Sequence, residues 1–229
     1  MTTLADRFNQ VCSRIRAAER ACGRHPGSVQ LLAVSKTKPV SDIAELYRLG
    51  QRHFAESYVQ EALNKQRQLA HYAISWHFIG PVQSNKTRQI AGHFSWVHSV
   101  DRLKIARRLH EQRPEYLPPL NICLQVNISA ESSKSGVGLE ELPQLAAAIK
   151  SLHRLTLRGV MAIPAPQTES RQQRQPYRRL VEAVAALRMA GMDTFSLGMS
   201  GDLEAAIAEG ATMVRIGTAL FGKRQEPQT

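Results

Sequence analysis

A lysine follows a short apolar run near the start of the chain, where its amine could act as a nucleophile. Residues 31–34 read as a buried strand, and Pro39 stops its continuation because proline has no N–H to donate. Side chains alternate across a strand, so Lys36, as the predicted last residue, points inward with Leu32 and Val34. A lysine amine in an apolar site can form a Schiff base, because desolvation favours its neutral form. The competing interpretation is a strand-end lysine that extends to water.

A second group of candidate residues lies near the C-terminus. One strand-like run leads into Ser200 and Gly201, where we expect a helix to begin, and another ends in Arg215, Gly217 and Thr218. The first N–H groups of a helix have no partner within it and hold phosphate well. Taken singly, Ser200 could be an N-cap and Gly217 a turn residue. Taken together, these residues predict a phosphate site with an arginine beside it.

Eight strand-like runs alternate with helical segments along the 229 residues. The runs begin near Leu31, Arg52, Trp76, Ser95, Leu120, Leu155, Thr194 and Met213. This alternation predicts an α/β fold with parallel strands, and the count of eight favours a closed TIM-type (β/α)8 barrel. The alternative is an open doubly wound sheet, but its fingerprint G-x-G-x-x-G is absent after the first run. No composition shift marks a second domain, so we expect a single domain over residues 1–229.

The helical segments carry their own start and stop signals. Apolar residues at spacings of three and four predict an amphipathic N-terminal helix at about 3–22, with Gly23 as its C-terminal stop. Ser57 and Gln60 have the spacing of a capping box and predict the start of another helix. Residues 224–229 are expected to be a frayed tail.

A barrel would bring the lysine and the phosphate site together. In such barrels chemistry collects at the C-terminal ends of the strands, and the loops after strands seven and eight often bind phosphate. A site with Lys36 facing this phosphate site and Arg215 suits an aldehyde-bearing phosphorylated ligand, and pyridoxal 5′-phosphate fits this description. Lys36 would form the aldimine. An arginine near the ring nitrogen would keep that nitrogen unprotonated, unlike the acidic partner used when the ring acts as an electron sink.

The composition limits the remaining classes of function. The net charge of +11 suggests nucleic acid, but the basic residues are spread along helical stretches without interleaved aromatic residues. We therefore expect no nucleic-acid partner. Cys12, Cys22 and Cys123 lack metal-ligand spacing, which predicts free thiols and no metal site. The chain has no signal peptide and no run of membrane-spanning length, so a cytoplasmic protein that does not bind membranes is expected.

One segment, residues 76–86 (WHFIGPVQSNK), is highly specific. It resembles the signature of the pyridoxal phosphate homeostasis protein family. Similar to other hallmark segments of that family are residues 33–37, 159–164, 197–200 and 214–222, so the resemblance spans nearly the whole chain. It implies a single barrel like the N-terminal domain of alanine racemases.

The resemblance also assigns residues to the cofactor pyridoxal 5′-phosphate. It implies that Lys36 carries the cofactor and that Arg215 meets the ring nitrogen. The phosphate would be bound by Ser200, Gly217 and Thr218, and the cofactor site would also include Ser57, Met199 and Gly201. Two of these residues depart from the family pattern: Ser57 stands where the family commonly has asparagine, and Gly201 where an acidic residue is frequent.

The implied role is intracellular homeostasis of vitamin B6. The protein would hold the cofactor on Lys36 and buffer or deliver it, with pyridoxal-phosphate-dependent apo-enzymes as recipients. It would be a monomer and would have no catalytic residues and no turnover. His77, Lys38 and Lys134 are expected to be, respectively, a hydrogen-bonded structural residue, an exposed lysine and a solvated loop lysine.

Two enzymatic alternatives remain. An amino-acid racemase could use the same barrel and cofactor, but a two-base racemase needs a second proton donor opposite the lysine. In the racemases that the chain resembles, an additional C-terminal domain and a partner subunit supply that donor. The chain ends seven residues after Gly222, which leaves no room for such a domain. The other alternative is an aldolase-like barrel enzyme that forms a Schiff base with a sugar phosphate.

Overall fold

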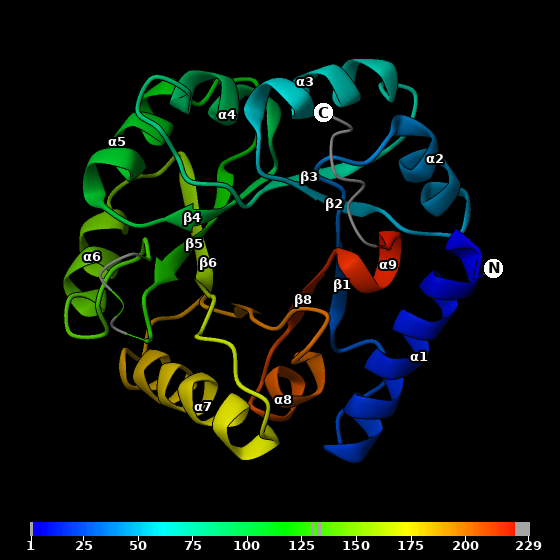
Figure 1. The fold of residues 1–229 in the computed structure, drawn as a ribbon. Coiled ribbons are helices and arrows are strands. Elements are labelled where there is room, and N and C mark those ends of the chain that lie inside the picture. Colours follow the sequence, from blue (N-terminus) through cyan, green and yellow to red (C-terminus); the bar gives the residue numbers. More distant parts are fainter. Residues whose placement is uncertain (1, 130, 132–133, 223–229) are drawn as a thin grey trace.

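Eight parallel strands pair in sequence order, and the last pairs with the first, which closes a barrel surrounded by helices (Figure 1). The computed structural model describes residues 2–129, 131 and 134–222. The strands are β1 (Gln30–Val34), β2 (His53–Glu56), β3 (Ser75–Phe78), β4 (Trp96–Val100), β5 (Leu120–Val126), β6 (Leu155–Ala162), β7 (Thr194–Ser196) and β8 (Met213–Ile216). The helices are α1 (Leu4–Ala21), α2 (Val40–Arg48), α3 (Val59–Gln68), α4 (Thr87–His93), α5 (Leu103–Gln112), α6 (Leu142–Ile149), α7 (Ser170–Ala186), α8 (Leu203–Ala208) and α9 (Thr218–Phe221).

The predicted barrel is confirmed, and each strand begins within one residue of its predicted start. All neighbouring strands are parallel. For example, Ala33 of β1 lies beside Phe54 of β2, and Leu32 of β1 lies beside Arg215 of β8. The open doubly wound sheet is therefore wrong, because β1 and β8 pair and leave no edge. Closure brings the C-terminal ends of β1, β7 and β8 to the same rim.

The helix signals were less reliable than the strand signals. α1 begins after Thr3, which forms a capping box with Asp6, and Gly23 beyond its end has a positive φ of 66°. The predicted capping box of Ser57 and Gln60 is wrong. The N-cap of α3 is Tyr58, and no side chain caps that helix. Ser57 instead lies before this cap, in the loop that follows β2.

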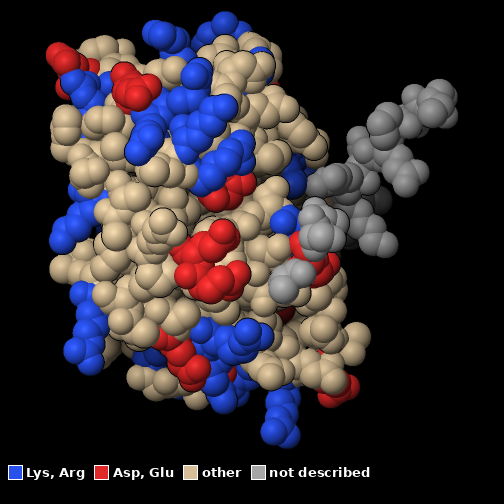
Figure 2. All heavy atoms as spheres, turned by 90° about the vertical axis from the view of Figure 1, so that its left-hand side faces the viewer, with Lys and Arg blue, Asp and Glu red and all other residues tan. Residues whose placement is uncertain are grey.

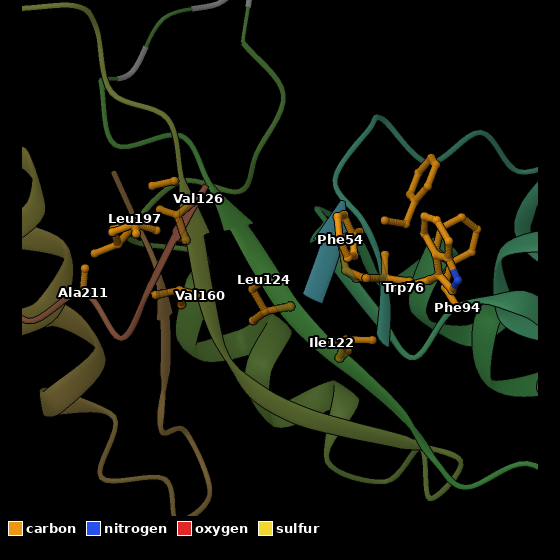
Figure 3. Close-up of a cluster of buried hydrophobic side chains, with 14 of the residues drawn as sticks. Phe54, Trp76, Phe94, Ile122, Leu124, Val126, Val160, Leu197 and Ala211 are labelled. Carbon is orange, nitrogen blue, oxygen red and sulfur yellow. The ribbon is translucent and has the colours of Figure 1, made fainter. Parts of the chain in front are cut away.

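The apolar core has an outer and an inner part. The outer part packs between the barrel and its helices, and Figure 3 shows a portion in which Phe54, Trp76 and Phe94 gather on one side. Each fully buried aromatic or aliphatic side chain here contributes about 2 kcal/mol through removal from water. The inner part is a small cluster of Leu32, Val34, Ala55 and Met213. Much of the remaining barrel interior is polar, and it lies beneath the candidate site.

The surface charge is mixed. On the face toward α4, α5 and α6, basic side chains gather near the top of Figure 2, with acidic side chains beside and below them. Some of the basic residues form ion pairs, such as Arg102 with Asp101 at 2.7 Å. Among the described helices, none combines the length and apolar character needed to cross a bilayer.

Candidate functional site

A cavity of about 360 Å³ opens at the rim where the strands end, and all eight residues predicted to bind the cofactor line it. They are Lys36, Ser57, Met199, Ser200, Gly201, Arg215, Gly217 and Thr218. Each follows the end of its strand or lies in the last half of it, so parallel closure alone brings them together. The remaining described residues of the wall are Val34, Lys38, Ile79, Met161, Ile163 and Gly222.

Lys36 lies in a loop rather than in the strand. β1 ends at Val34, so the prediction that Lys36 is the last strand residue is wrong by two positions. Lys36 is half-buried and still lines the cavity together with Val34, as the alternation of side chains predicted. The next residue, Thr37, has a φ of 64°, a left-handed conformation that is strained for a residue with a β-branched side chain.

A buried ion network holds the backbone on both sides of Lys36. We call Lys65, Glu56 and Glu61 the Lys65 network. Lys65 is 5% exposed, and its Nζ lies 2.8 Å from Glu56 Oε1 and 2.6 Å from Glu61 Oε1. It also donates to the carbonyl oxygen of Ser35 at 2.7 Å. This network was not predicted from the sequence.

The two acids of this network reach the residues next to Lys36. Glu56 Oε1 accepts a hydrogen bond from the Ser35 hydroxyl at 2.6 Å, and Glu61 Oε1 accepts one from the Thr37 N–H at 2.6 Å. Burial raises the pKa of Glu56, while Lys65 opposes that shift. Because Ser35 is bound to the buried Glu56 and Thr37 to the partly buried Glu61, the network fixes the strained loop that carries Lys36.

The opposite wall of the cavity is built by the loops after β7 and β8. Ser200 does not begin α8, because the N-cap of that helix is Asp202, so this part of the prediction is wrong. The Ser200 hydroxyl instead accepts the N–H of Ala219 at 3.1 Å, which ties the β7 loop to the start of α9. Gly217 is the N-cap of α9 and Thr218 its first residue. The first N–H groups of α9 therefore lie at the cavity wall.

Asp202 fixes the β7 loop from beneath. Its Oδ1 accepts the N–H of Met199 at 2.7 Å, and its Oδ2 accepts the hydroxyl of the fully buried Tyr177 at 2.6 Å. Arg14 of α1 adds a bond from Nη2 to the carbonyl oxygen of Ser200 at 3.2 Å. These contacts hold Met199, Ser200 and the peptide bond between them in one conformation.

Arg215 is a buried cation on the inner wall of the cavity. It is 3% exposed, and its Nη1 donates to the carbonyl oxygen of Ser196 and, at 3.0 Å, to the Ser196 hydroxyl. Its Nη2 donates to the carbonyl oxygen of Ala162 at 3.0 Å. Burial lowers the pKa of Arg215, and the nearby Tyr177 and Asp202 oppose this effect. Within the part of the chain that the structure describes, no carboxylate forms an ion pair with Arg215.

The cavity wall as a whole is electropositive. Among the described lining residues, Lys36, Lys38 and Arg215 are cationic and none is acidic. The expectation that Lys38 is exposed is wrong: it is half-buried, and its Nζ donates to the carbonyl oxygens of Phe221 and Gly222 at 3.3 and 3.4 Å. A wall with this donor set favours an anionic ligand that accepts hydrogen bonds.

Two other residues singled out from the sequence, His77 and Lys134, do not line this cavity. His77 is fully buried and hydrogen-bonded, with its Nδ1 2.9 Å from His98 Nε2, as predicted for a structural histidine. Lys134 is not simply solvated, since it pairs with Glu131 at 2.7 Å. In the described residues, no group of three or more His, Cys, Asp or Glu side chains could hold a metal ion.

Comparison with known proteins gives close relatives. Residues 9–225 match the family model for the alanine racemase N-terminal domain. A pyridoxal phosphate homeostasis protein of Pseudomonas aeruginosa is 60% identical over 224 residues, which cover 98% of this chain and 97% of that protein.

Solved structures agree with this relationship. The structure of PipY from Synechococcus elongatus with pyridoxal phosphate bound is similar with a TM-score of 0.80 and 36% identity, over 91% of this chain and 100% of that chain. Alanine racemase from Corynebacterium glutamicum matches with a TM-score of 0.67 and 14% identity, over 96% of this chain and 62% of that chain. The second similarity shows the shared fold alone.

Proposed function

Since the chain belongs to the pyridoxal phosphate homeostasis protein family, we propose that it binds pyridoxal 5′-phosphate and serves vitamin B6 homeostasis inside the cell. In this role it holds the cofactor on Lys36 and buffers or delivers it, with no turnover of its own. The observation that carries the proposal is the cavity itself: lysine amines, a buried arginine and the start of a helix line one small space, and none of its described residues is acidic.

The cavity suits this cofactor in size and in donor chemistry. Its volume of about 360 Å³ falls within the range of small-ligand pockets. Pyridoxal phosphate supplies an aldehyde that bonds reversibly to an amine, an anionic phosphate and a ring nitrogen. Two lysines, Lys36 and Lys38, line the cavity, and we assign the aldehyde to Lys36. Lys38 donates to the carbonyl oxygens of Phe221 and Gly222. Ser200, Gly217 and Thr218 supply hydroxyl and backbone donors for the phosphate.

Arg215 is assigned to the ring nitrogen. A guanidinium has only donors, so the ring nitrogen that faces it must accept and therefore stays unprotonated. The charge of Arg215, which no carboxylate in the described residues balances through an ion pair, also adds to the attraction for the phosphate. Ser57, Met199 and Gly201 complete the wall around the cofactor. The serine at position 57 is shorter than the asparagine common in the family and makes a weaker ring contact.

Two features of the site support a carrier rather than an enzyme. An unprotonated ring nitrogen is a poor electron sink, which disfavours reactions that depend on a stabilised carbanion. In addition, the described residues of the cavity wall include no Tyr, His, Cys, Asp or Glu to act as a second proton donor, and their one further lysine, Lys38, donates to the carbonyl oxygens of Phe221 and Gly222. The recipients of the cofactor would be pyridoxal-phosphate-dependent apo-enzymes, and the carrier would act as a monomer.

The experiment is a spectroscopic titration of the purified protein with pyridoxal phosphate. The unbound cofactor, which is itself yellow, is removed by gel filtration before the spectra are compared. We expect the wild type to remain yellow and the Lys36→Ala variant to be colourless. Lys104→Ala, which changes an exposed lysine on α5, should behave as the wild type. A wild type that is colourless after this step would overturn the proposal and favour the aldolase-like alternative.

The racemase alternative is kept because residues 9–225 match a racemase domain. It is tested by incubating the loaded protein with single enantiomers of amino acids in deuterated water. We expect no exchange of the α-hydrogen above the level of free cofactor. Robust exchange or racemisation that disappears in Lys36→Ala would replace the carrier with an enzyme.

A further inference from the structure

Three histidines and a serine form a continuous hydrogen-bonded chain through the barrel interior. We call His53, His77, His98 and Ser196 the histidine chain. His53 Nδ1 lies 3.1 Å from His77 Nε2, and His77 Nδ1 lies 2.9 Å from His98 Nε2. His98 Nδ1 lies 2.9 Å from the Ser196 hydroxyl, which also receives the bond from Arg215 at 3.0 Å.

The histidine chain connects the cavity to the opposite end of the barrel. Arg215 lines the cavity, and His77, His98 and Ser196 are completely buried in the middle of the barrel. His53 is the first residue of β2 and only half-buried, so the chain reaches the end of the barrel where the strands begin. The histidine chain thus extends from the Arg215 guanidinium through the barrel interior to His53.

One bond direction follows readily from Arg215. An arginine can only donate, so the Ser196 oxygen accepts from it, and the serine hydroxyl can then give its own proton to His98 Nδ1. In this direction His98 carries its proton on Nε2 and donates to His77 Nδ1. His77 in turn donates from Nε2 to His53 Nδ1, with the Ser75 hydroxyl as a second neighbour at 3.3 Å. All three imidazoles are then neutral and share one tautomer.

The charged groups around the chain also favour neutral imidazoles. Arg215 lies at one end, and burial together with its charge lowers the pKa of His98 to about 3. On the other side, His77 stacks on Trp96 at 5.4 Å between ring centroids, and the Arg158 guanidinium lies 5.1 Å from the Trp96 ring. Asp193 balances the charge of Arg158 through an ion pair at 2.7 Å. A proton added to the histidine chain would therefore be opposed by burial and by Arg215, and both keep the imidazoles uncharged.

We propose that Ser196, His98 and His77 are positioning residues for Arg215, and that their one-directional chain fixes which guanidinium N–H groups face the cofactor. Nη1 is held by Ser196 and Nη2 by Ala162 on the protein side, which leaves the remaining N–H groups of Arg215 for a ligand in the cavity. This inference rests on the proposed function, because it concerns the contact between Arg215 and the ring nitrogen.

The first test uses the protein without cofactor and therefore does not depend on the proposed function. Nitrogen NMR of ¹⁵N-histidine-labelled protein distinguishes the two tautomers and the charged form. We expect His77 and His98 to be neutral and protonated on Nε2 between pH 5 and 8, and the His98 signals to change in Ser196→Ala. Protonation of His98 on Nδ1 in the wild type would overturn the chain.

The second test compares cofactor binding by the wild type, Ser196→Ala and His98→Leu, with His93→Leu on the exposed side of α4 as the control. Ser196→Ala is the milder change, since it keeps the Arg215 bond to the backbone carbonyl. Loss of one hydrogen bond to Arg215 should weaken cofactor binding roughly threefold to tenfold. We also expect a shifted visible absorbance maximum, while the cofactor stays on Lys36.

The outcomes of this test separate the two ideas. A wild type that does not bind pyridoxal phosphate overturns the proposed function. The NMR test then decides, without any cofactor, whether the histidine chain has the expected bond direction. A wild type that binds the cofactor while Ser196→Ala matches it in affinity and absorbance overturns the positioning role. Should His98→Leu fail to fold, Ser196→Ala alone decides.

Discussion

The two sides of the cavity treat buried charge in opposite ways. Near Lys36, the buried cation Lys65 is neutralised by Glu56 and Glu61, and the whole group serves to hold a loop. Across the cavity, the buried cation Arg215 is held only by neutral oxygen atoms in the part of the chain that is described. A charge balanced by its neighbours supports the fold, whereas an unbalanced one at a cavity wall remains available to a ligand.

Removal of the Lys65 charge should produce the largest change in stability. The Lys65→Met variant leaves Glu56 buried without its cation and frees Glu61 from its partner, and such a loss costs about 3 to 5 kcal/mol of the unfolding free energy. Chemical denaturation measures this value. Lys104→Met on the exposed surface of α5 is the control, with a change below about 0.5 kcal/mol. An equally small change in Lys65→Met would mean that the network does not hold the loop.

The matching change on the other side is Arg215→Met. It removes a desolvated cation that has no ion-pair partner among the described residues, so the unfolding free energy should change by less than about 2 kcal/mol. Cofactor affinity should fall by more than about tenfold, because a hydrogen bond from a charged donor is lost. If Arg215→Met lowers the unfolding free energy as much as Lys65→Met does, then the two buried cations do not differ in their contribution to the fold.

Low pH should lower the unfolding free energy through the buried His98 beside Arg215. The pKa of His98 is lowered from 6.5 to about 3, first by burial and then by Arg215. Between these values the unfolded chain binds a proton that the folded chain does not, so stability falls as the pH decreases through this window. At pH 5 the loss from His98 is about 2 kcal/mol.

The measurement is the unfolding free energy at pH 7 and at pH 5 for the wild type and His98→Gln. The glutamine can still accept and donate but does not titrate, so the decrease between the two pH values should be about 2 kcal/mol smaller in the variant. Equal decreases would show that His98 is already charged in the folded protein.

The smallest effect should come from the strained residue next to Lys36. Thr37 has a φ of 64°, and a glycine adopts this conformation without a steric cost. We expect Thr37→Gly to leave the unfolding free energy unchanged or to raise it by up to about 1 kcal/mol, because relief of strain is partly offset by greater freedom of the unfolded chain. Thr37→Ala retains a Cβ and should show no gain. A clear loss of stability in Thr37→Gly alone would mean that Thr37 is not strained.

The sequence predicted the strands and the cavity residues well, for one physical reason. Strands buried on both faces read as apolar runs, and closure of a parallel barrel brings their C-terminal ends to one rim. Lys36 and Arg215 could therefore be placed in the same cavity before any contact was known. Ser57 was placed there as well, although its predicted role as a helix cap was wrong.

The parts that the sequence did not reveal depend on the packing of elements against one another. Glu61 and Lys65 are four residues apart on α3, a spacing typical of an exposed ion pair. The burial of Lys65 depends on how α3 packs against β2. His53, His77 and His98 lie on three neighbouring strands, β2, β3 and β4. Whether their rings meet depends on the register between these strands. Neither arrangement has a signal in the spacing alone.

The most direct test of the carrier role is to locate the cofactor on the chain. The protein loaded with pyridoxal phosphate is reduced with borohydride, which makes the bond to the amine permanent, and its peptides are then mapped by mass spectrometry. We expect the added pyridoxyl mass on the peptide that contains Lys36, and no such peptide from Lys36→Ala. Labelling confined to Lys134 or another lysine, with Lys36 unmodified, would contradict the assignment.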